Sequence, residues 1–202
     1  MFTGLIEEVG HVAAVEETER GLRISVSASH VMDDLKLGDS ISVDGVCQTV
    51  VDLQADRFAV EAMAPTLART TFGGLRPQQK LNLERAMTLA TRLGGHLVQG
   101  HVDGVGTVTG VQRAGEHVLI DIEVPETIAD VTVLHGSIAV NGVSLTVNAI
   151  PRPRAIQVAI IPHTWEHTNF PQLQPGSAVN LEGDMIGKFV VEYMKKRGSH
   201  AV

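Results

Sequence analysis

The sequence predicts an all-β fold: two similar six-stranded antiparallel Greek-key barrels in tandem, followed by a C-terminal α-helix. Three observations support this prediction. The chain repeats itself after about 97 residues, its apolar residues alternate with polar ones in short runs, and its last segment is amphipathic. Period-two alternation is typical of strands, and a long internal period indicates a duplicated structural unit.

The repeat is clearest in Ser40–Val50, Ser-Ile-Ser-Val-Asp-Gly-Val-Cys-Gln-Thr-Val, which returns 97 residues later as Ser137–Val147, identical at seven of eleven positions. Leu81–Glu84 recurs as Val179–Glu182, and further matches in the same order occur at nearly the same offset. Such ordered blocks indicate a tandem duplication. We therefore expect an N-terminal unit at 1–97, a C-terminal unit at 98–183, and a helix with a short tail at 184–202.

Strands are predicted where apolar residues alternate. In the first repeat these runs are Leu22–Ser27, Ser40–Val43 and Phe58–Glu61, and in the second they are Val118–Val124 and Ile156–Ile161. About ninety residues per repeat accommodate six such strands. A closed barrel is favoured because closure leaves no free sheet edge.

Two segments break the alternation. Leu83–Leu93 has a helical composition and ends at Gly94-Gly95, so we expect a linker helix between the two units. The segment Asp184–Arg197 carries an apolar stripe, with acidic residues near its start and basic residues at its end, as favours a helix. This second helix either caps its own barrel or mediates self-association.

Composition excludes several classes of function. The net charge is −7, and no Lys/Arg block is present to bind nucleic acid or an anionic membrane. The single cysteine excludes an internal disulfide and fits a reducing compartment. Neither a secretory signal nor an apolar run of about 18 residues is seen, so a cytoplasmic location is expected.

The candidate chemistry lies at equivalent places in the two repeats. Cys47 occupies the position that Ser144 holds in the second copy, which suggests two pockets of shared shape with divided roles. A lone cysteine is also often a small buried hydrophobic residue. His96 and His101 flank the repeat boundary, and we expect one of them to contact a ligand rather than the pair to bind a metal. The paired threonines are candidate donors to a polar heterocycle: Thr49, Thr66, Thr146 and Thr164.

Several motifs together resemble the riboflavin synthase family of alpha-chain type. They are Met-Phe-Thr-Gly-Leu-Ile-Glu-Glu at the start, Gly-Val-Cys-x-Thr-Val, Leu-Asn-Leu-Glu-Arg-Ala, Gly-Gly-His-Leu-Val-Gln-Gly-His-Val-Asp, Gly-Val-Ser-Leu-Thr-Val and Ile-Pro-His-Thr. The resemblance spans essentially the whole chain, and the motifs follow the family's order.

The resemblance implies two lumazine-binding barrels per chain and a cofactor-free dismutation without a metal. Two molecules of 6,7-dimethyl-8-ribityllumazine exchange a four-carbon unit, giving riboflavin and 5-amino-6-(D-ribitylamino)uracil, in the last step of riboflavin biosynthesis. It also implies a homotrimer, with each active site between the N-terminal barrel of one subunit and the C-terminal barrel of its neighbour. Association with a lumazine synthase shell is left open.

Site residues follow from the same resemblance. The expected catalytic set is Cys47, His101, Ser40, Asn141 and Ser144. The expected ligand contacts of the N-terminal barrel and connector are Gly4, Leu5, Ile6, Cys47, Gln48, Thr49, Glu61, Ala62, Met63, Ala64, Pro65, Thr66, Gly100, His101 and Val102. Those of the C-terminal barrel are His135, Ser144, Leu145, Thr146, Ala159, Ile160, Ile161, Pro162, His163 and Thr164.

Three departures affect the expected hydrogen bonding to the ligand. Gln48 stands where the family usually has Leu, Pro65 where it has Glu, and His135 where it has Lys. Three alternatives also remain: a non-catalytic lumazine or flavin carrier of antenna type, a flavin-dependent oxidoreductase, and a plain interaction module. Against the oxidoreductase, the chain lacks an Arg-x-Tyr-Ser signature and a Gly-x-Gly-x-x-Gly loop.

Overall fold

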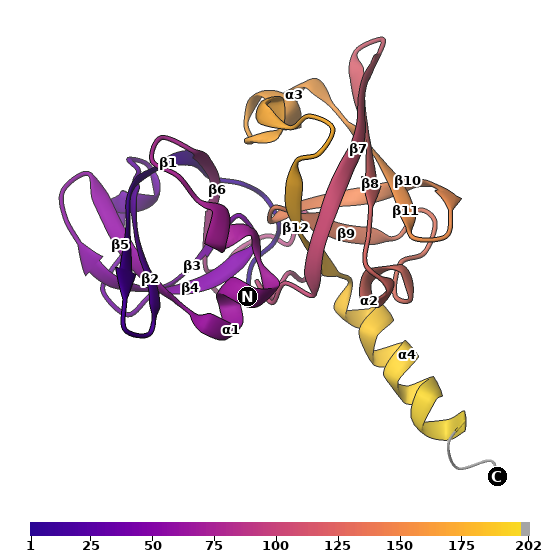
Figure 1. The fold of residues 1–202 in the computed structure, drawn as a ribbon, viewed down its shortest axis with the longest axis horizontal. Helices are drawn as coiled ribbons and strands as arrows, with labels where there is room; N and C mark the ends of the chain where they lie inside the picture. The colour runs from indigo at the N-terminus through magenta and orange to yellow at the C-terminus, as the bar shows by residue number, and fades with distance from the viewer. Residues whose placement is uncertain (199–202) are drawn as a thin grey trace.

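Two closed barrels make up most of the computed structural model, which describes residues 1–198 (Figure 1). Each barrel has six antiparallel strands, as predicted. The first contains β1 (Glu8–Thr18), β2 (Gly21–Ser27), β3 (Ser40–Val43), β4 (Val46–Leu53), β5 (Arg57–Met63) and β6 (Lys80–Arg85). The second contains β7 (Gly104–Ala114), β8 (His117–Glu123), β9 (Ser137–Val140), β10 (Val143–Arg152), β11 (Ala155–Ile160) and β12 (Ala178–Gly183).

The two barrels have the same topology. Around the first barrel the strands follow the order β1-β2-β5-β4-β3-β6, and the second runs β7-β8-β11-β10-β9-β12. Even the irregularities recur, because the register shifts between Val12 and Ala14 in β1 and between Val108 and Gly110 in β7. The duplication inferred from the sequence is therefore present at the level of strand pairing.

Alternation along the strands gives each barrel its own core. In β4, Val46, Gln48 and Val50 are buried, whereas Cys47 is half-buried and Thr49 is exposed. Successive strand side chains point to opposite faces, so Cys47 and Thr49 lie on the outer surface of the barrel. Both cores consist mainly of Val, Ile and Leu. Each also contains a buried phenylalanine at the equivalent position, Phe72 or Phe170, and the first core contains a further one, Phe58.

Short helices join the strands at equivalent places in the two halves. The α-helices are α1 (Ala64–Arg69), α2 (Glu126–Ala129) and α3 (Pro162–Glu166), and the 3-10 turns are η1 (Val31–Asp33), η2 (Thr71–Gly74) and η3 (Phe170–Gln172). In both α1 and α3 a proline stands in the first turn, where its missing N–H would have no partner anyway. These two helices follow β5 and β11 and frame the candidate pockets.

The predicted linker helix at Leu83–Leu93 is wrong. Its first three residues belong to β6, and the chain from 86 to 103 contains no helix. The reason is that tertiary strand pairing outweighs the local helical propensity. Leu83 is fully buried in the barrel core and pairs with both Glu8 and Val43, which fixes an extended backbone despite the helical composition.

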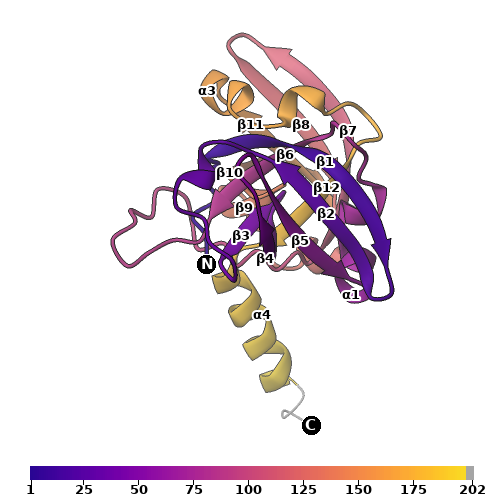
Figure 2. The same cartoon turned by 90° about the vertical axis from the view of Figure 1, so that its left-hand side faces the viewer.

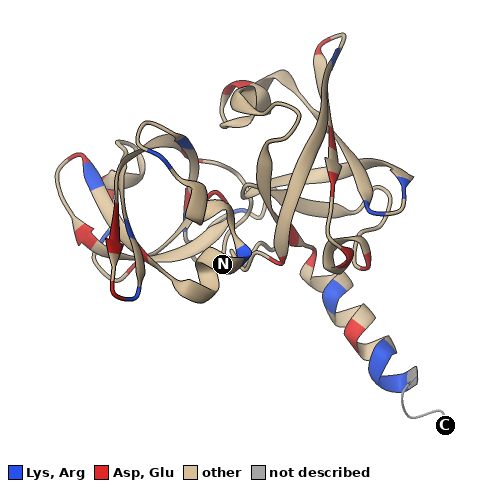
Figure 3. Cartoon of the chain, in the orientation of Figure 1, with Lys and Arg blue, Asp and Glu red and all other residues tan. Residues whose placement is uncertain are grey.

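The C-terminal helix was predicted correctly, and α4 (Met185–Gly198) projects away from both barrels (Figures 1 and 2). Three basic residues, Lys195, Lys196 and Arg197, lie in its last turn, whereas the charges of the barrels are scattered (Figure 3). The helix exposes an apolar stripe at helical spacing, consisting of Ile186, Phe189, Val190, Tyr193 and Met194. Because Ile186 is 68% and Phe189 69% exposed, α4 does not cap its own barrel.

Within residues 1–198, no helix is both long enough and apolar enough to span a bilayer.

Candidate active site

The segment that leads into each repeat lies against the barrel of the other repeat. We call residues 2–7 and 98–103 the leading segments, because they precede β1 and β7. The backbone N–H of Cys47 donates to the carbonyl of Gly100 at 2.9 Å, and that of Ser144 donates to Gly4 at 2.8 Å. Ile6 packs against the second core and Val102 against the first. Each candidate position is thus completed by the other half of the chain.

Glycine is required at both crossing points. Gly4 has φ of 76° and Gly100 has φ of 78°, a region that side chains rarely adopt. A Cβ at Gly4 would lie 2.5 Å from the Cβ of Ser144, and one at Gly100 would lie 2.6 Å from the Cβ of Cys47. The close approach therefore depends on the absence of a side chain.

Two buried glutamates hold the leading segments in place. Glu84 accepts the backbone N–H groups of Thr3 at 2.6 Å and Gly4 at 3.0 Å. Glu182 does the same for Gln99 at 2.7 Å and His101 at 2.9 Å. Burial raises the pKa of both carboxyls, and these hydrogen bonds oppose the rise. Neither residue was among the predicted site residues, although both lie in the repeated Asn-Leu-Glu block.

A pocket of about 240 Å³ opens beside Cys47. It brings together residues from β4, from the α1 helix and its C-terminal cap, and from the leading segment of the second repeat. The lining residues are Val46, Cys47, Pro65, Thr66, Arg69, Thr70, Gly100, His101 and Val102. Six of these nine were predicted as ligand contacts, so the structure assembles much of the expected N-terminal site. Arg69 lines the pocket too and was not predicted.

The corresponding place in the second barrel is occupied by a histidine. The Nδ1 of His96 lies 2.7 Å from the Oγ of Ser144, and the side chain is buried. Its Nε2 has no hydrogen-bond partner among the described residues. Burial lowers the pKa of His96, although Asp184 opposes this shift, so the surroundings favour the neutral imidazole. The residues alone left open which of the two linker histidines contacts a ligand, and the resemblance implied His101. The structure places His96 at Ser144 and His101 in the pocket beside Cys47.

The turns between β3 and β4 and between β9 and β10 meet where the barrels touch. Asp44 and Asn141 both have positive φ, and the glycines that follow them are in contact. The carboxylate of Asp44 accepts hydrogen bonds from the Asn82 backbone at 2.7 Å and the Asn169 amide at 2.9 Å. Burial raises the pKa of Asp44 to about 7. Asn141, predicted to be catalytic, lies in this inter-barrel network, where its Oδ1 accepts the Asn180 N–H.

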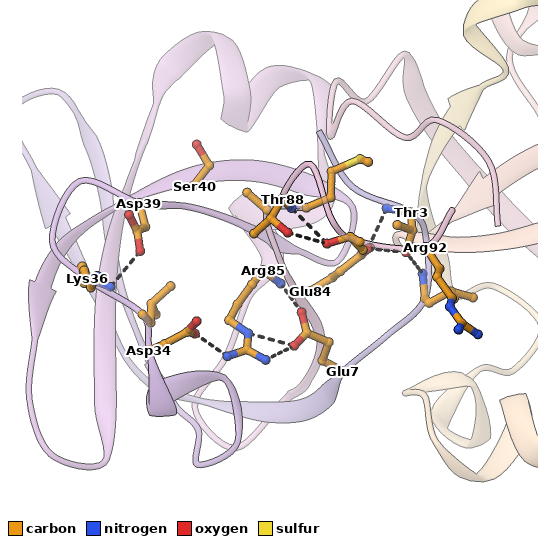
Figure 4. Close-up of a pocket in the computed structure, with 15 residues that line it drawn as sticks. Thr3, Glu7, Asp34, Lys36, Asp39, Ser40, Glu84, Arg85, Thr88 and Arg92 are labelled. Atoms are coloured by element: carbon orange, nitrogen blue, oxygen red, sulfur yellow. Dashed lines mark hydrogen bonds and ion pairs between the residues drawn. The ribbon is translucent and has the colours of Figure 1, made fainter. Parts of the chain in front are cut away.

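Ser40 does not line the pocket beside Cys47. It lines a second cavity of about 550 Å³ (Figure 4), in which Arg85 bridges Glu7 and Asp34. The Arg85 Nε donates to the Oε2 of Glu7 at 2.8 Å. Because the guanidinium is already paired with two carboxylates, this cavity presents no free cation at Arg85 to an anionic ligand.

The remaining predicted contacts differ in what they can offer a ligand. Ala62 and Ile160 face the barrel cores, so only their backbone groups are accessible. Glu61 is exposed and pairs with Arg23 at 3.4 Å. The other residues of the N-terminal set are half-buried or exposed: Leu5, Ile6, Thr49, Met63, Ala64. So are those of the C-terminal set: Leu145, Thr146, Ala159, Ile161, Pro162, His163, Thr164.

The three departures from the family pattern have distinct structural settings. Gln48 points into the first barrel, donates to the carbonyl of Cys47 at 2.9 Å, and leaves its Oε1 without a partner among the described residues. Pro65 lies in the first turn of α1. His135 is exposed with φ of 61°, and its N–H donates to Val147 at 3.0 Å.

Comparison with known proteins agrees with this architecture. The lumazine binding domain model matches twice, at residues 3–86 and 99–184. Riboflavin synthase of Bacillus amyloliquefaciens is 40% identical, covering 97% of this chain and 91% of the relative. That of Mycobacterium bovis is 41% identical, covering 98% of this chain and the whole of the relative.

Solved structures show the same fold. A crystal structure of LumP complexed with riboflavin has a TM-score of 0.85 at 24% identity, covering 91% of this chain and 99% of the other. LumP complexed with 6,7-dimethyl-8-(1'-D-ribityl) lumazine has a TM-score of 0.82 at 23% identity, with the same coverage. With the doubled domain match and the full-length relatives taken together, the chain belongs to the riboflavin synthase family of lumazine-binding proteins.

Proposed function

We propose that this protein is a riboflavin synthase, a transferase that moves a four-carbon unit between two molecules of 6,7-dimethyl-8-ribityllumazine. The products are riboflavin and 5-amino-6-(D-ribitylamino)uracil. Full-length relatives of that name at about 40% identity support the assignment. The observation that carries it here is the doubled barrel, because a reaction that consumes two copies of one substrate needs two similar binding places.

Catalysis by such a protein rests on alignment and proton transfer. Holding two heterocycles in a reactive orientation can lower the barrier by roughly 7–11 kcal/mol. Positioned acid–base groups add roughly 10²–10⁴-fold each. Because the substrate ring is itself electrophilic and its C7-methyl protons are acidic, these contributions suit the reaction.

We assign roles to four residues. His101 transfers a proton for the molecule in the N-terminal pocket, and Cys47, in the same pocket, is its nucleophile or hydrogen-bond donor. Ser144 and Thr146 hold the second molecule at the C-terminal barrel, where His96 hydrogen-bonds the Ser144 hydroxyl. Ser40 and Asn141 lie in a separate cavity and at the inter-barrel turn, so we expect them to support the site rather than contact the reacting atoms.

The function is tested by incubating the purified protein with the lumazine and following the appearance of flavin absorbance. Turnover is expected from the wild-type protein, and Cys47→Ser and His101→Gln are expected to reduce it. If both variants stayed within twofold of wild type, the role assignment would be wrong. A protein that bound the lumazine and produced no flavin would instead be a carrier of the antenna type.

We further propose that α4 mediates assembly into a homotrimer in the cytoplasm, so that an N-terminal pocket of one subunit faces the C-terminal barrel of the next. The exposed apolar stripe of α4 supports self-association, because an isolated surface helix rarely presents so many large apolar side chains. Sedimentation of the full-length protein beside a form truncated before Asp184 tests this. Retention of the same assembly by the truncated form would refute it.

A further inference from the structure

Arg69 is a cation in the N-terminal pocket without a bonded partner. It is the last residue of α1, and it lines the same 240 Å³ pocket as Cys47 and His101. The side chain is exposed, and among residues 1–198 it makes no ion pair and no hydrogen bond. Arg85, which lines the 550 Å³ cavity, is by contrast held by Glu7 and Asp34. The Arg69 guanidinium is thus available to whatever fills the pocket.

The second barrel has no equivalent cation. The residue 98 positions later is His167, whose ring stacks on His163 with centroids 4.2 Å apart. Its Nδ1 lies 2.8 Å from the His163 carbonyl oxygen, so the ring is already engaged. Neither Lys nor Arg occurs among the ligand contacts predicted for that barrel, since His135 stands where the family usually has Lys. The two binding places therefore differ in permanent charge.

This asymmetry matters because the reaction treats its two substrate molecules differently. One of them must lose a proton from its C7 methyl group: the C–H bond breaks, the proton passes to a base, and the electron pair spreads over the ring. A neutral ring then becomes an anion. A fixed positive charge that adjoins this ring favours the anion, and the effect grows as the pocket excludes water. The resulting carbanion carbon then forms a bond to an electrophilic C=N carbon in the ring of the other molecule. The π bond of that C=N group breaks, its electron pair moves to the ring nitrogen, and the nitrogen takes up a proton.

We propose that the N-terminal pocket is where the lumazine is deprotonated, with Arg69 stabilising the anion, and that the C-terminal barrel holds the neutral molecule that the anion attacks. This rests on the proposed function and deepens it by assigning the two chemical roles to the two pockets. His101, in the same pocket as Arg69, is positioned to accept the proton.

Deuterium exchange tests the proposal separately from turnover. The full-length protein is mixed with 6,7-dimethyl-8-ribityllumazine in D₂O, and loss of the C7-methyl proton signal is followed by NMR, after subtraction of the exchange in protein-free buffer. Arg69→Met is expected to slow the protein-dependent exchange at least tenfold. Arg69→Lys, which keeps the charge, is expected to stay within about threefold of wild type.

Matched control variants distinguish the loss of charge in the pocket from the loss of an arginine elsewhere in the barrel. Arg76→Met removes an exposed arginine of the same barrel that lines none of the described pockets, and wild-type exchange is expected. His167→Met changes the equivalent position of the second barrel and is also expected to leave exchange unchanged. Riboflavin affinity, measured by fluorescence quenching, should differ less than threefold between wild type and Arg69→Met, which shows that the variant is folded and binds.

Three results would overturn the proposal: wild-type exchange in Arg69→Met, equal slowing in His167→Met, or failure of Arg69→Lys to restore the rate. Failure of the proposed function has a different signature. A wild-type protein that accelerates exchange and forms no riboflavin would not be a synthase, and the Arg69 comparison would still decide the role of the pocket.

Discussion

The two barrels share a framework and differ beside the candidate pockets and at the turns where the barrels touch. Strand order, register shifts, crossing glycines and the carboxylates that hold the leading segments all occur twice. Three pairs of equivalent residues differ in chemistry: Cys47 and Ser144, Asp44 and Asn141, and Arg69 and His167. A pocket opens beside Cys47, whereas the buried His96 lies against Ser144.

This distribution follows from packing. Core positions cannot change alone without a cavity or a clash, whereas outward-facing strand residues change at little cost. Cys47 and Ser144 are such positions, since both are half-buried on the outer face of a strand. The two repeats have therefore kept the same barrel fold, while the side chains on their outer faces have come to differ in chemistry. The following predictions test that contrast, from the largest expected effect to the smallest.

The largest effect is expected from His101→Gln. Loss of the proton-transferring group in the N-terminal pocket should reduce turnover by roughly 10²-fold or more, measured as the initial rate of flavin formation. His117→Gln, an exposed histidine on the β8 side of a hairpin, serves as the control and should retain the wild-type rate. Equal rates for the two variants would contradict a special role for the pocket beside Cys47.

Gly100→Ala should destabilise the fold by about 2–4 kcal/mol, since the new Cβ needs both a left-handed backbone and space that Cys47 occupies. Gly4→Ala should cost about as much, because its crossing is equivalent. Gly115→Ala also has positive φ and has open space around it, so it should lose only about 1 kcal/mol. Chemical denaturation measures all three. A loss for Gly100→Ala no larger than that of Gly115→Ala would show that the crossing is adaptable.

Asp44→Asn should make stability less dependent on pH. The folded-state pKa of Asp44 is raised from 3.8 to about 7, so its contribution to stability is complete below pH 4 and is lost as pH rises to about 7. The stability of Asp44→Asn minus that of wild type should therefore be up to about 4 kcal/mol larger at pH 8 than at pH 4. Asn141 shows that an amide fits the equivalent turn. Unfolding free energies between pH 4 and pH 8 test this, and Asp56→Asn, exposed and remote, should leave the wild-type slope. An unchanged slope in Asp44→Asn would refute the effect.

The smallest effect is expected from Ser144→Ala. Removing the hydroxyl leaves the buried Nδ1 of His96 without its 2.7 Å partner, at a cost of about 1–2 kcal/mol. Thr146→Ala, two residues along the same strand and exposed, should be nearly neutral in the same denaturation experiment. Equal stability of the two variants would mean that the contact between His96 and Ser144 contributes nothing measurable.

The sequence predicted the fold well because the fold is encoded in local alternation and in an internal repeat. The six strands per barrel and the C-terminal helix follow from such patterns. The linker helix failed because Leu83 and Glu84 have helical propensity and are nevertheless held in β6 by pairing with two strands. Propensity is a weak guide where tertiary pairing competes with it.

The candidate site was predicted less completely. Six of the nine residues that line the pocket beside Cys47 were predicted as ligand contacts in separate motifs, and the structure brings them together. The packing of each leading segment against the barrel of the other repeat was not predicted. No local sequence pattern encodes a contact between residues as far apart as Gly100 and Cys47. Arg69 was missed although it lies in the repeated block between Thr66 and Thr70. Aligning Arg69 with His167, 98 residues later in the second repeat, would have revealed the difference in charge between the two halves.

The leading segments have one further consequence. Phe2 and Val98 pair with each other as an isolated antiparallel bridge, with N–H···O distances of 2.7 and 3.1 Å, and both side chains are fully buried between the barrels. Neither repeat is therefore a portable module. A single repeat expressed alone would lack the leading segment that the other repeat supplies to its pocket. It could complete that pocket only if a second copy of the repeat supplied its own leading segment.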